Sequence, residues 1–151
     1  MSFLIENLLI INIKTYFKYV FCLIDKSVVS CYNLDDLRGV VMLSEIEKYA
    51  HEENVPIMLS DGIDYLCNYI KEHNIKKILE IGSAIGYSAI RMALVDDDIC
   101  ITTIEKDEKR YKIACENIDK FNLNDRINII LDDALNTKII RYNPVFKMLR
   151  V

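Results

Sequence analysis

The stretch Leu79–Ala93, with the sequence LEIGSAIGYSAIRMA, decides the fold of this chain. It begins as a short apolar segment typical of a β-strand, crosses a loop with Gly82 and Gly86, and continues as a helix-like segment. The first glycine allows the chain to turn tightly as it leaves the strand. The second allows the helix to begin close to a ligand, because no Cβ stands in the way. We therefore expect a ligand-binding loop between a strand and a helix.

Strands and helices alternate around this stretch. The predicted strands cover residues 77–81, 99–105 and 127–131, and the predicted helices cover residues 87–95 and 107–121, the latter capped by Asp107. Strands that are apolar throughout and alternate with helices indicate parallel pairing, with helices covering the faces of the sheet. Right-handed crossovers place the three strands in the spatial order 3-2-1. The fold class predicted here is α/β.

Two further helices are predicted before the first strand. Ser44 and Glu47 form a capping box that opens a helix ending near Glu52, and Pro56 breaks it. Ser60 or Asp61 caps the next helix, which ends near Asn74. Its apolar face is formed by Ile63, Leu66, Cys67 and Ile70.

Residues 1–42 form an apolar amino-terminal segment that we expect to be helical and to pack on the core or on a partner chain. Its longest run without a charge, Asn7–Ile13, is shorter than the roughly 20 apolar residues that span a bilayer. An acid, Glu6, precedes that run where a secretory signal would carry basic residues. We therefore expect no transmembrane segment, and we assign residues 43–151 to a separate functional region.

The composition fits one globular domain of 151 residues, 52% hydrophobic and 28% charged. The net charge of −4 argues against a broad nucleic-acid-binding surface. None of the five cysteines forms a C-x-x-C pair, which excludes the common zinc spacings. Buried free thiols in a reducing cytosol are the simplest interpretation, and they indicate a cytoplasmic protein.

The glycine loop does not fit phosphate-binding motifs. It lacks the Lys-Ser or Lys-Thr of a P-loop, and Ala84 stands where the dinucleotide fingerprint has a glycine. Glu80 with no basic residue in the loop suits a ligand with cationic groups, such as an amino acid that carries a sulfonium. At the next strand ends, Glu105 is placed to accept from ribose hydroxyls, and Asp133 with the Ala134 amide to bind adenine.

Each of these residues also has a structural explanation. Glu80 can be an exposed carboxylate at a strand end, Glu105 can begin a turn, and Asp133 can cap a helix. Tyr87 and Ser88 can simply open the helix that follows the loop. Three acids at successive strand ends, together with the glycine loop, are a more specific pattern than any one of them.

Residues 43–135 resemble the class I S-adenosylmethionine-dependent O-methyltransferases, and most of all the bacterial branch related to the caffeoyl-CoA and catechol enzymes. The matching pieces are YAHEENVPIM, KKILEIGSAIGYSAIRMA, ITTIEKDEKRYKIACENI and LNDRINIILDDAL. The VPIM segment together with the glycine loop most resembles the tRNA 5-hydroxyuridine methyltransferases, which make 5-methoxyuridine. The resemblance implies a Rossmann-like methyltransferase fold.

The resemblance also implies a set of donor contacts. They are Met58, Glu80, Gly82, Gly86, Ser88, Glu105 for the ribose, and Asp133 with Ala134 for the adenine. Asp132 departs from the family, which usually has a glycine there. A glycine permits backbone angles that an aspartate tolerates only in part, so this position affects how adenine would be placed.

The family's magnesium ligands and catalytic lysine belong to an Asp-Ala-Ala-Lys segment and a later Asp-Asn pair. This sequence instead ends DDALNTKIIRYNPVFKMLRV, so we assign no catalytic residue and no metal ligand. We expect a chain truncated after the third strand, with residues 43–151 as the cofactor-binding half. The outer edge of strand 77–81 would then lack a neighbour, which favours self-association into a homo-oligomer or coverage by the amino-terminal segment.

The leading function is methyl transfer from S-adenosylmethionine to an oxygen acceptor, with tRNA as the predicted partner, although we expect no useful rate from this chain alone. A non-catalytic cofactor-binding or interaction fragment remains open, as does a small-molecule O-methyltransferase. A nicotinamide-binding domain is disfavoured by the missing third glycine and by Glu80. The tRNA assignment depends on resemblance, because the basic residues are scattered over Lys71, Lys76, Lys77, Lys106, Lys109, Arg110 and Lys112.

Overall fold

The structure, a computed structural model, describes residues 34–136 and 147–148. The chain divides into two compact units, Met1–Val40 and Val41–Val151, and the second contains the predicted site. Most of the predicted amino-terminal segment lies outside the described residues, so its helical character stays a prediction.

None of the helices among the described residues is both long enough and apolar enough to span a membrane.

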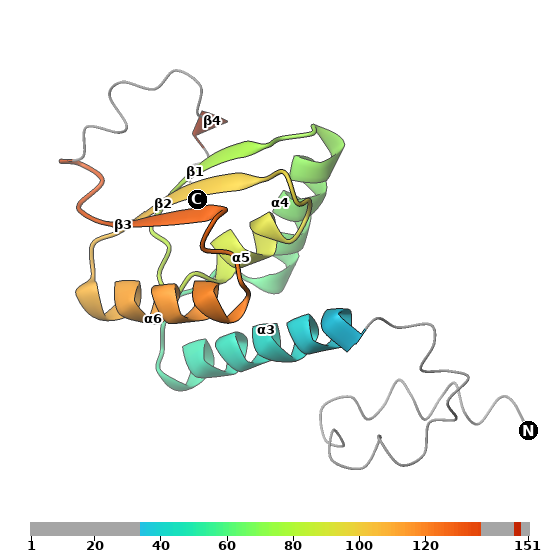
Figure 1. Cartoon of the computed structure of the whole chain (residues 1–151). Helices are drawn as coiled ribbons and strands as arrows, with labels where there is room; N and C mark the ends of the chain where they lie inside the picture. Colours follow the sequence, from blue (N-terminus) through green and yellow to red (C-terminus); the bar gives the residue numbers. More distant parts are fainter. Residues whose placement is uncertain (1–33, 137–146, 149–151) are drawn as a thin grey trace, which may run out of the picture. The chain divides into compact units, whose positions relative to one another are not determined.

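Helices and strands alternate along the second unit, and they form a parallel sheet. In chain order the elements are α3 (Leu34–Glu52), α4 (Ser60–Glu72), β1 (Lys77–Ile81), α5 (Tyr87–Ala93), β2 (Cys100–Glu105), α6 (Glu108–Lys120), β3 (Ile127–Leu131) and β4 (Lys147–Met148). The strands lie in the order β3-β2-β1-β4, and all pairings are parallel (Figure 1). The predicted α/β class and the order 3-2-1 are confirmed.

The outer edge of β1 has a neighbour, contrary to our expectation. Ile78 pairs with Lys147 and Leu79 with Met148, so β4 extends the sheet beyond β1. The prediction of a bare edge is wrong at these two positions, because a segment late in the chain satisfies the backbone groups there. A strand of two residues has no recognisable hydrophobic period, so periodicity could not predict it.

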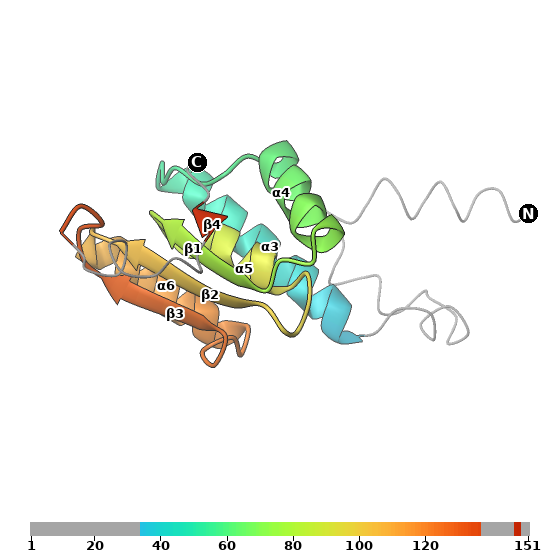
Figure 2. The same cartoon turned by 90° about the horizontal axis from the view of Figure 1, so that it is seen from above.

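The described helices lie on one side of the sheet. In Figure 1, α5 and α6 lie directly beneath the strands, and Figure 2 shows the same two helices behind the sheet. The predicted flanking helices are confirmed, and no helix covers the other face of the sheet within the described residues. The core lies between these layers, where alternate strand residues meet apolar helix residues. Its members include Ile78, Ile101 and Ile127 from the strands and Ile90 and Ile118 from the helices.

The helix starts show where the sequence signals succeeded and failed. Ser44 does not begin a helix, because α3 already starts at Leu34, and the Ser44 hydroxyl donates to the Val41 carbonyl at 2.8 Å. A serine inside a helix can donate its hydroxyl to a carbonyl of the preceding turn. The next helix begins at Ser60, after Leu59 and without a side-chain cap, so the predicted caps there are wrong. Asp107 does cap α6, accepting from the Arg110 amide at 2.8 Å.

Candidate donor-binding site

The glycine loop turns sharply between β1 and α5. Gly82 and Gly86 have φ angles of 89° and 84°, and Ala84 between them has a φ of 47°. The left-handed region suits glycine, since it has no Cβ to meet the backbone. A Cβ on Gly82 would enter open space, whereas a Cβ on Gly86 would lie 3.4 Å from the Ala114 Cβ on α6. Gly86 therefore permits close packing of α6, and its donor contact stays a prediction.

Glu105 fastens this loop to the end of β2. Its side chain is only 5% exposed. Oε2 accepts from the Ala84 amide at 2.8 Å, and Oε1 accepts from the Lys106 and Asp107 amides at 2.9 Å each. One carboxylate thus holds three backbone N–H groups on two loops. Glu105 does begin a turn, as its structural explanation required, and it also reaches the glycine loop.

Glu80 is buried and does not lie exposed at the strand end. Its residue is 8% exposed, and it faces α5 from within β1. Oε1 accepts from the Ser88 hydroxyl at 2.5 Å, and Oε2 accepts from the Thr103 hydroxyl at 2.6 Å. Burial raises the pKa of the Glu80 carboxyl; the Ser88 and Thr103 hydrogen bonds lower it, and the charge of Glu105 raises it further. Two predicted donor contacts, Glu80 and Ser88, therefore form one hydrogen-bonded unit.

The segment after β3 joins the same edge of the sheet. The Asp132 amide donates to the Glu105 carbonyl at 3.0 Å, which brings this segment beside the end of β2. The Asp133 carboxylate accepts from the Leu135 amide at 2.9 Å, so it stabilises its own turn. Ala134 lies within that turn and is half-buried. No helix follows Asp133 within the described residues, so its role as a helix cap is not shown, and its adenine contact stays a prediction.

Met58 lies apart from these contacts in the connection between α3 and α4. It is half-buried and packs on the core, with its Cγ 3.4 Å from the Cβ position of Gly62. Among the residues that the structure describes, Met58 makes no hydrogen bond to the glycine loop, and it does not lie within 4 Å of the Cβ positions of Gly82 and Gly86. Its donor contact therefore stays a prediction.

Sequence reasoning missed several hydrogen bonds that hold the loop and its helix. Thr103 was read only as part of a strand. Tyr87 donates its hydroxyl to Glu47 at 2.5 Å and accepts from Arg91 at 3.1 Å, and Arg91 pairs with Asp64. Burial and the neighbouring Glu47 raise the pKa of Tyr87 to about 12. This network joins α3, α4 and α5 immediately behind the loop.

Asn117, which sequence reasoning also missed, supports the loop from α6. Its side-chain amide is buried and donates to the Ile85 carbonyl at 2.9 Å. Replacing Asn117 with leucine, which is similar in size, should lower the free energy of unfolding by about 1–3 kcal/mol, because the carbonyl would be buried without a donor. Urea denaturation measures this change. Asn124→Leu is the control, since Asn124 bonds to Asp119 in an exposed position, and it should change stability by less than about 0.5 kcal/mol. Equal effects of the two substitutions would contradict the role of Asn117.

One polar atom in the loop lacks a partner. The Ser83 hydroxyl is buried and makes no hydrogen bond with any residue in the described part of the chain. Such groups are rare in native structures and call for a water or a ligand. This observation fits a loop that is completed by a bound molecule.

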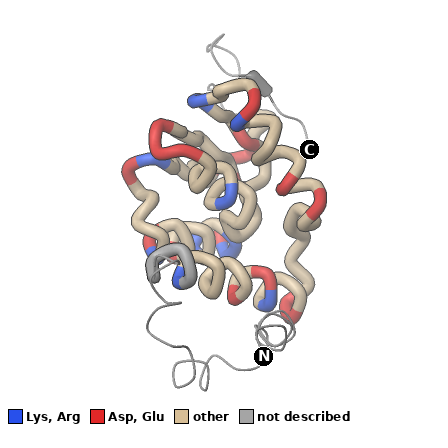
Figure 3. The backbone as a smooth tube through the Cα atoms, turned by 90° about the vertical axis from the view of Figure 1, so that its right-hand side faces the viewer, with Lys and Arg blue, Asp and Glu red and all other residues tan. Residues whose placement is uncertain are grey.

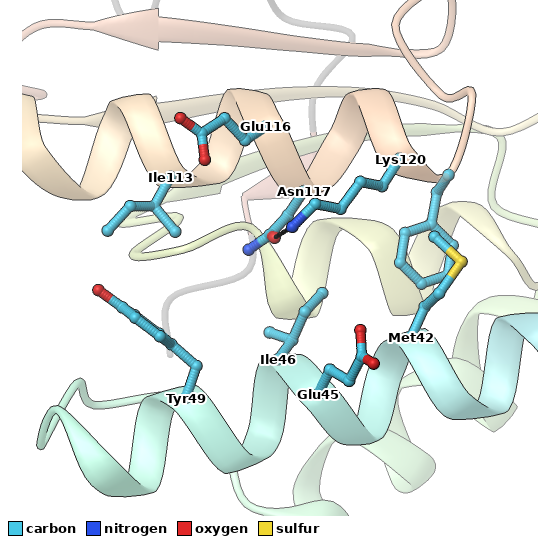
Figure 4. A pocket seen from close by; sticks show the side chains of 9 residues that line it. Met42, Glu45, Ile46, Tyr49, Ile113, Glu116, Asn117 and Lys120 are labelled. Carbon is cyan, nitrogen blue, oxygen red and sulfur yellow. Dashed lines mark hydrogen bonds between the residues drawn. The ribbon is translucent and has the colours of Figure 1, made fainter. Parts of the chain in front are cut away.

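A separate cavity of about 400 Å³ lies between α3 and α6 (Figure 4). It is lined by Met42, Glu45, Ile46, Tyr49, Ile113, Glu116, Asn117, Lys120 and Phe121. None of these residues is a predicted donor contact. The cavity is therefore distinct from the site at the sheet edge.

Neither the charge distribution nor the possible metal ligands identify a further binding site among the described residues. In the view of Figure 3, the basic positions are interspersed with acidic ones and form no continuous stripe. Within residues 34–136 and 147–148, no group of three or more His, Cys, Asp or Glu side chains could hold a metal ion. The described residues therefore do not fit the magnesium ion that the resemblance implies.

Known proteins resemble this chain over most of its length. The model of the O-methyltransferase family matches residues 13–141. Caffeoyl-CoA O-methyltransferase from Populus kitakamiensis is 33% identical over 89 residues, which are 58% of this chain and 37% of that protein. A solved O-methyltransferase from Bacillus cereus, in complex with SAH, is 30% identical with a TM-score of 0.58, covering 64% of this chain and 45% of that one.

A Staphylococcus aureus structure named for caffeoyl-CoA O-methyltransferases is 34% identical with a TM-score of 0.61, covering 68% of this chain and 50% of that one. The chain spans half or less of the length of each of these relatives. The family model, in contrast, covers far more than half of the chain. The chain belongs to the O-methyltransferase family.

Proposed function

We propose that this chain binds S-adenosylmethionine at the carboxyl edge of β1, β2 and β3 and acts as the donor-binding part of an O-methyltransferase. The observation that carries the proposal is the hydrogen-bonded cluster at this edge, where Glu80, Ser88, Glu105 and the glycine loop converge. The family supports the proposal, and so does the Bacillus cereus relative, whose structure is a complex with SAH.

The donor would use each part of this edge differently. Its ammonium group would lie at Glu80 and Ser88, and its chain would pass over Gly82 and Gly86. The ribose would meet Glu105, which already accepts three amide hydrogens. A carboxylate offers about four acceptor positions, so one direct ribose hydrogen bond is the most that fits without moving an amide. Adenine would lie at Asp133 and Ala134, with Met58 contributing an apolar contact.

The acceptor in this proposal is an ionisable hydroxyl on a planar ring. The names of the relatives favour a phenol of the caffeoyl-CoA or catechol type. The second candidate is 5-hydroxyuridine in tRNA, which the VPIM segment and the glycine loop suggest by resemblance. In either case the ionised oxygen would attack the sulfonium methyl in line, and the donor would leave as its demethylated product. A metal that lowers the pKa of the hydroxyl would assist, but no described residue holds one.

A cytoplasmic location belongs to the same proposal. Cys67, Cys100 and Cys115 are free thiols, which is the state expected in a reducing compartment.

Titration calorimetry with S-adenosylmethionine tests donor binding, and NAD is the matched control because it shares adenine and ribose. We expect binding of the first and none of the second. The absence of heat with S-adenosylmethionine on folded protein would overturn the proposal. Transfer of a radiolabelled methyl group to caffeoyl-CoA or to tRNA carrying 5-hydroxyuridine decides between the acceptors. Donor binding with label in neither would support the non-catalytic alternative.

A further inference from the structure

Glu80 is a buried carboxylate held by two hydroxyl groups, and no ion pair joins it to a cation within residues 34–136 and 147–148. Thr103, which holds one oxygen, is completely buried. Ser88 holds the other oxygen. None of the ion pairs found within the described residues includes Glu80. A buried carboxylate without a cation is unfavourable, and either a proton or a cationic ligand relieves this state.

While no ligand is bound, burial and one neighbouring charge disfavour the ionised form of Glu80. From β2, Glu105 adds a like charge and raises the pKa of Glu80, in the same direction as burial. From α5, Ser88 contributes a neutral hydroxyl, and Arg91 on the same helix is turned toward Asp64 and Tyr87. The hydroxyls of Ser88 and Thr103 oppose the rise in pKa without supplying a positive charge.

Thr103 is placed to orient the carboxylate. In the parallel register of β1 and β2, Glu80 lies directly beside Thr103, and the two side chains share the face that meets α5. The Thr103 hydroxyl fixes Oε2 from the sheet, while Ser88 fixes Oε1 from the helix. The rotation of the carboxylate is therefore set by groups from two elements before any ligand arrives.

We propose that Thr103 is a positioning residue of the donor site, and that donor binding releases a proton that Glu80 carries in the donor-free chain. This inference rests on the proposed function. The balance is simple: the carboxylic acid of Glu80 and the ammonium of the donor become a carboxylate–ammonium pair, and one proton passes to the solvent. No covalent bond to carbon changes in this step.

The sign of the pH dependence follows from this exchange. The donor favours the ionised form of Glu80, so its affinity should rise with pH above the pKa of Glu80 in the complex and level off above the raised pKa of the donor-free chain. The steepest slope is about tenfold per pH unit for one proton. The α-amino group of the donor titrates near 7.7–8.0, with about the value of a free amino terminus, so measurements below pH 7 isolate Glu80.

Calorimetry in buffers of different ionisation enthalpy counts the protons. With S-adenosylmethionine between pH 5 and pH 7, we expect the wild-type chain to release a fraction of a proton that falls as pH rises. Methylthioadenosine keeps the adenine, ribose and sulfur but has no ammonium, and it should bind without proton release. Binding of S-adenosylmethionine with no proton release at any of these pH values would overturn the inference and leave the proposed function standing. No binding at all would overturn both.

Thr103→Val tests the positioning role, because valine keeps the shape and removes only the hydroxyl. Loss of the hydroxyl should move the rise in donor affinity to higher pH. It should weaken S-adenosylmethionine binding at pH 6 by about tenfold or more and leave methylthioadenosine binding unaffected. Thr103→Ser should restore the wild-type profile, and Glu80→Gln should abolish proton release. Equal weakening of both ligands by Thr103→Val, in protein with a native circular dichroism spectrum, would mean that Thr103 is only structural.

Discussion

Replacing Glu105 with alanine is expected to lower the free energy of unfolding by about 3–5 kcal/mol and to abolish measurable binding of S-adenosylmethionine. The residue is 5% exposed and accepts three amide hydrogens, from Ala84, Lys106 and Asp107. Hydrogen bonds to a charged group contribute about 1.5–3 kcal/mol each, and the sum is reduced because water can reach some of the freed amides. Loss of a ribose contact alone would weaken donor binding by about 1.5–3 kcal/mol. Release of the glycine loop adds to that loss.

Two comparisons separate these effects. Glu105→Gln keeps one acceptor oxygen and should show an intermediate loss of stability. Glu108→Ala removes a nearby acid whose partner, Lys112, is exposed, and it should have a far smaller effect than Glu105→Ala. Chemical denaturation gives the stabilities, and calorimetry gives the affinities. If folded Glu105→Ala binds S-adenosylmethionine with wild-type affinity, Glu105 makes no ribose contact. If Glu105→Ala is as stable as Glu108→Ala, the hydrogen bonds from Glu105 to the loop amides do not stabilise the fold.

The sequence predicted the central strands well because their boundaries are chemically sharp. β1 and β3 occupy the predicted residues. Each is a short, mainly apolar run with a basic residue at its start, and Gly82 or Asp132 marks its end. The first helix was placed too late, because Ser44 fits a capping box by spacing alone while its hydroxyl bonds within the helix. Spacing does not distinguish these two uses of serine.

The candidate site was predicted as a set of ligand contacts, whereas the structure shows that these residues also bind one another. Glu105 accepts from the loop, and Glu80 accepts from Ser88 and Thr103. Hydrogen bonds between elements depend on register, which hydrophobic periodicity does not supply. The place of Thr103 could be predicted in part, because it lies two residues before Glu105 and therefore on the same face of the strand. Aligning the predicted ends of the first two strands would have paired Glu80 with Ile104, one residue away from the observed partner Thr103.

Substitution at Gly86 has the second large expected effect. Gly86→Val should lower the free energy of unfolding by about 2–6 kcal/mol, from two sources. A β-branched residue at a φ of 84° is a strained outlier that costs about 1–3 kcal/mol. The Cβ position also lies 3.4 Å from the Ala114 Cβ, so the γ-methyl groups would push α6 away, which costs about 1–3 kcal/mol more.

Gly82 provides the matched control for this argument, because its φ of 89° is almost the same while a Cβ there enters open space. Alanine at either position should cost about 1–2 kcal/mol, since the backbone strain is shared and a lone methyl still fits against Ala114. Valine should separate the two positions, with Gly86→Val less stable than Gly82→Val by about 1–3 kcal/mol. Urea denaturation of the four variants measures both differences. If the two valine variants have the same stability, α6 does not pack against Gly86, and the second glycine of the loop serves the backbone turn alone.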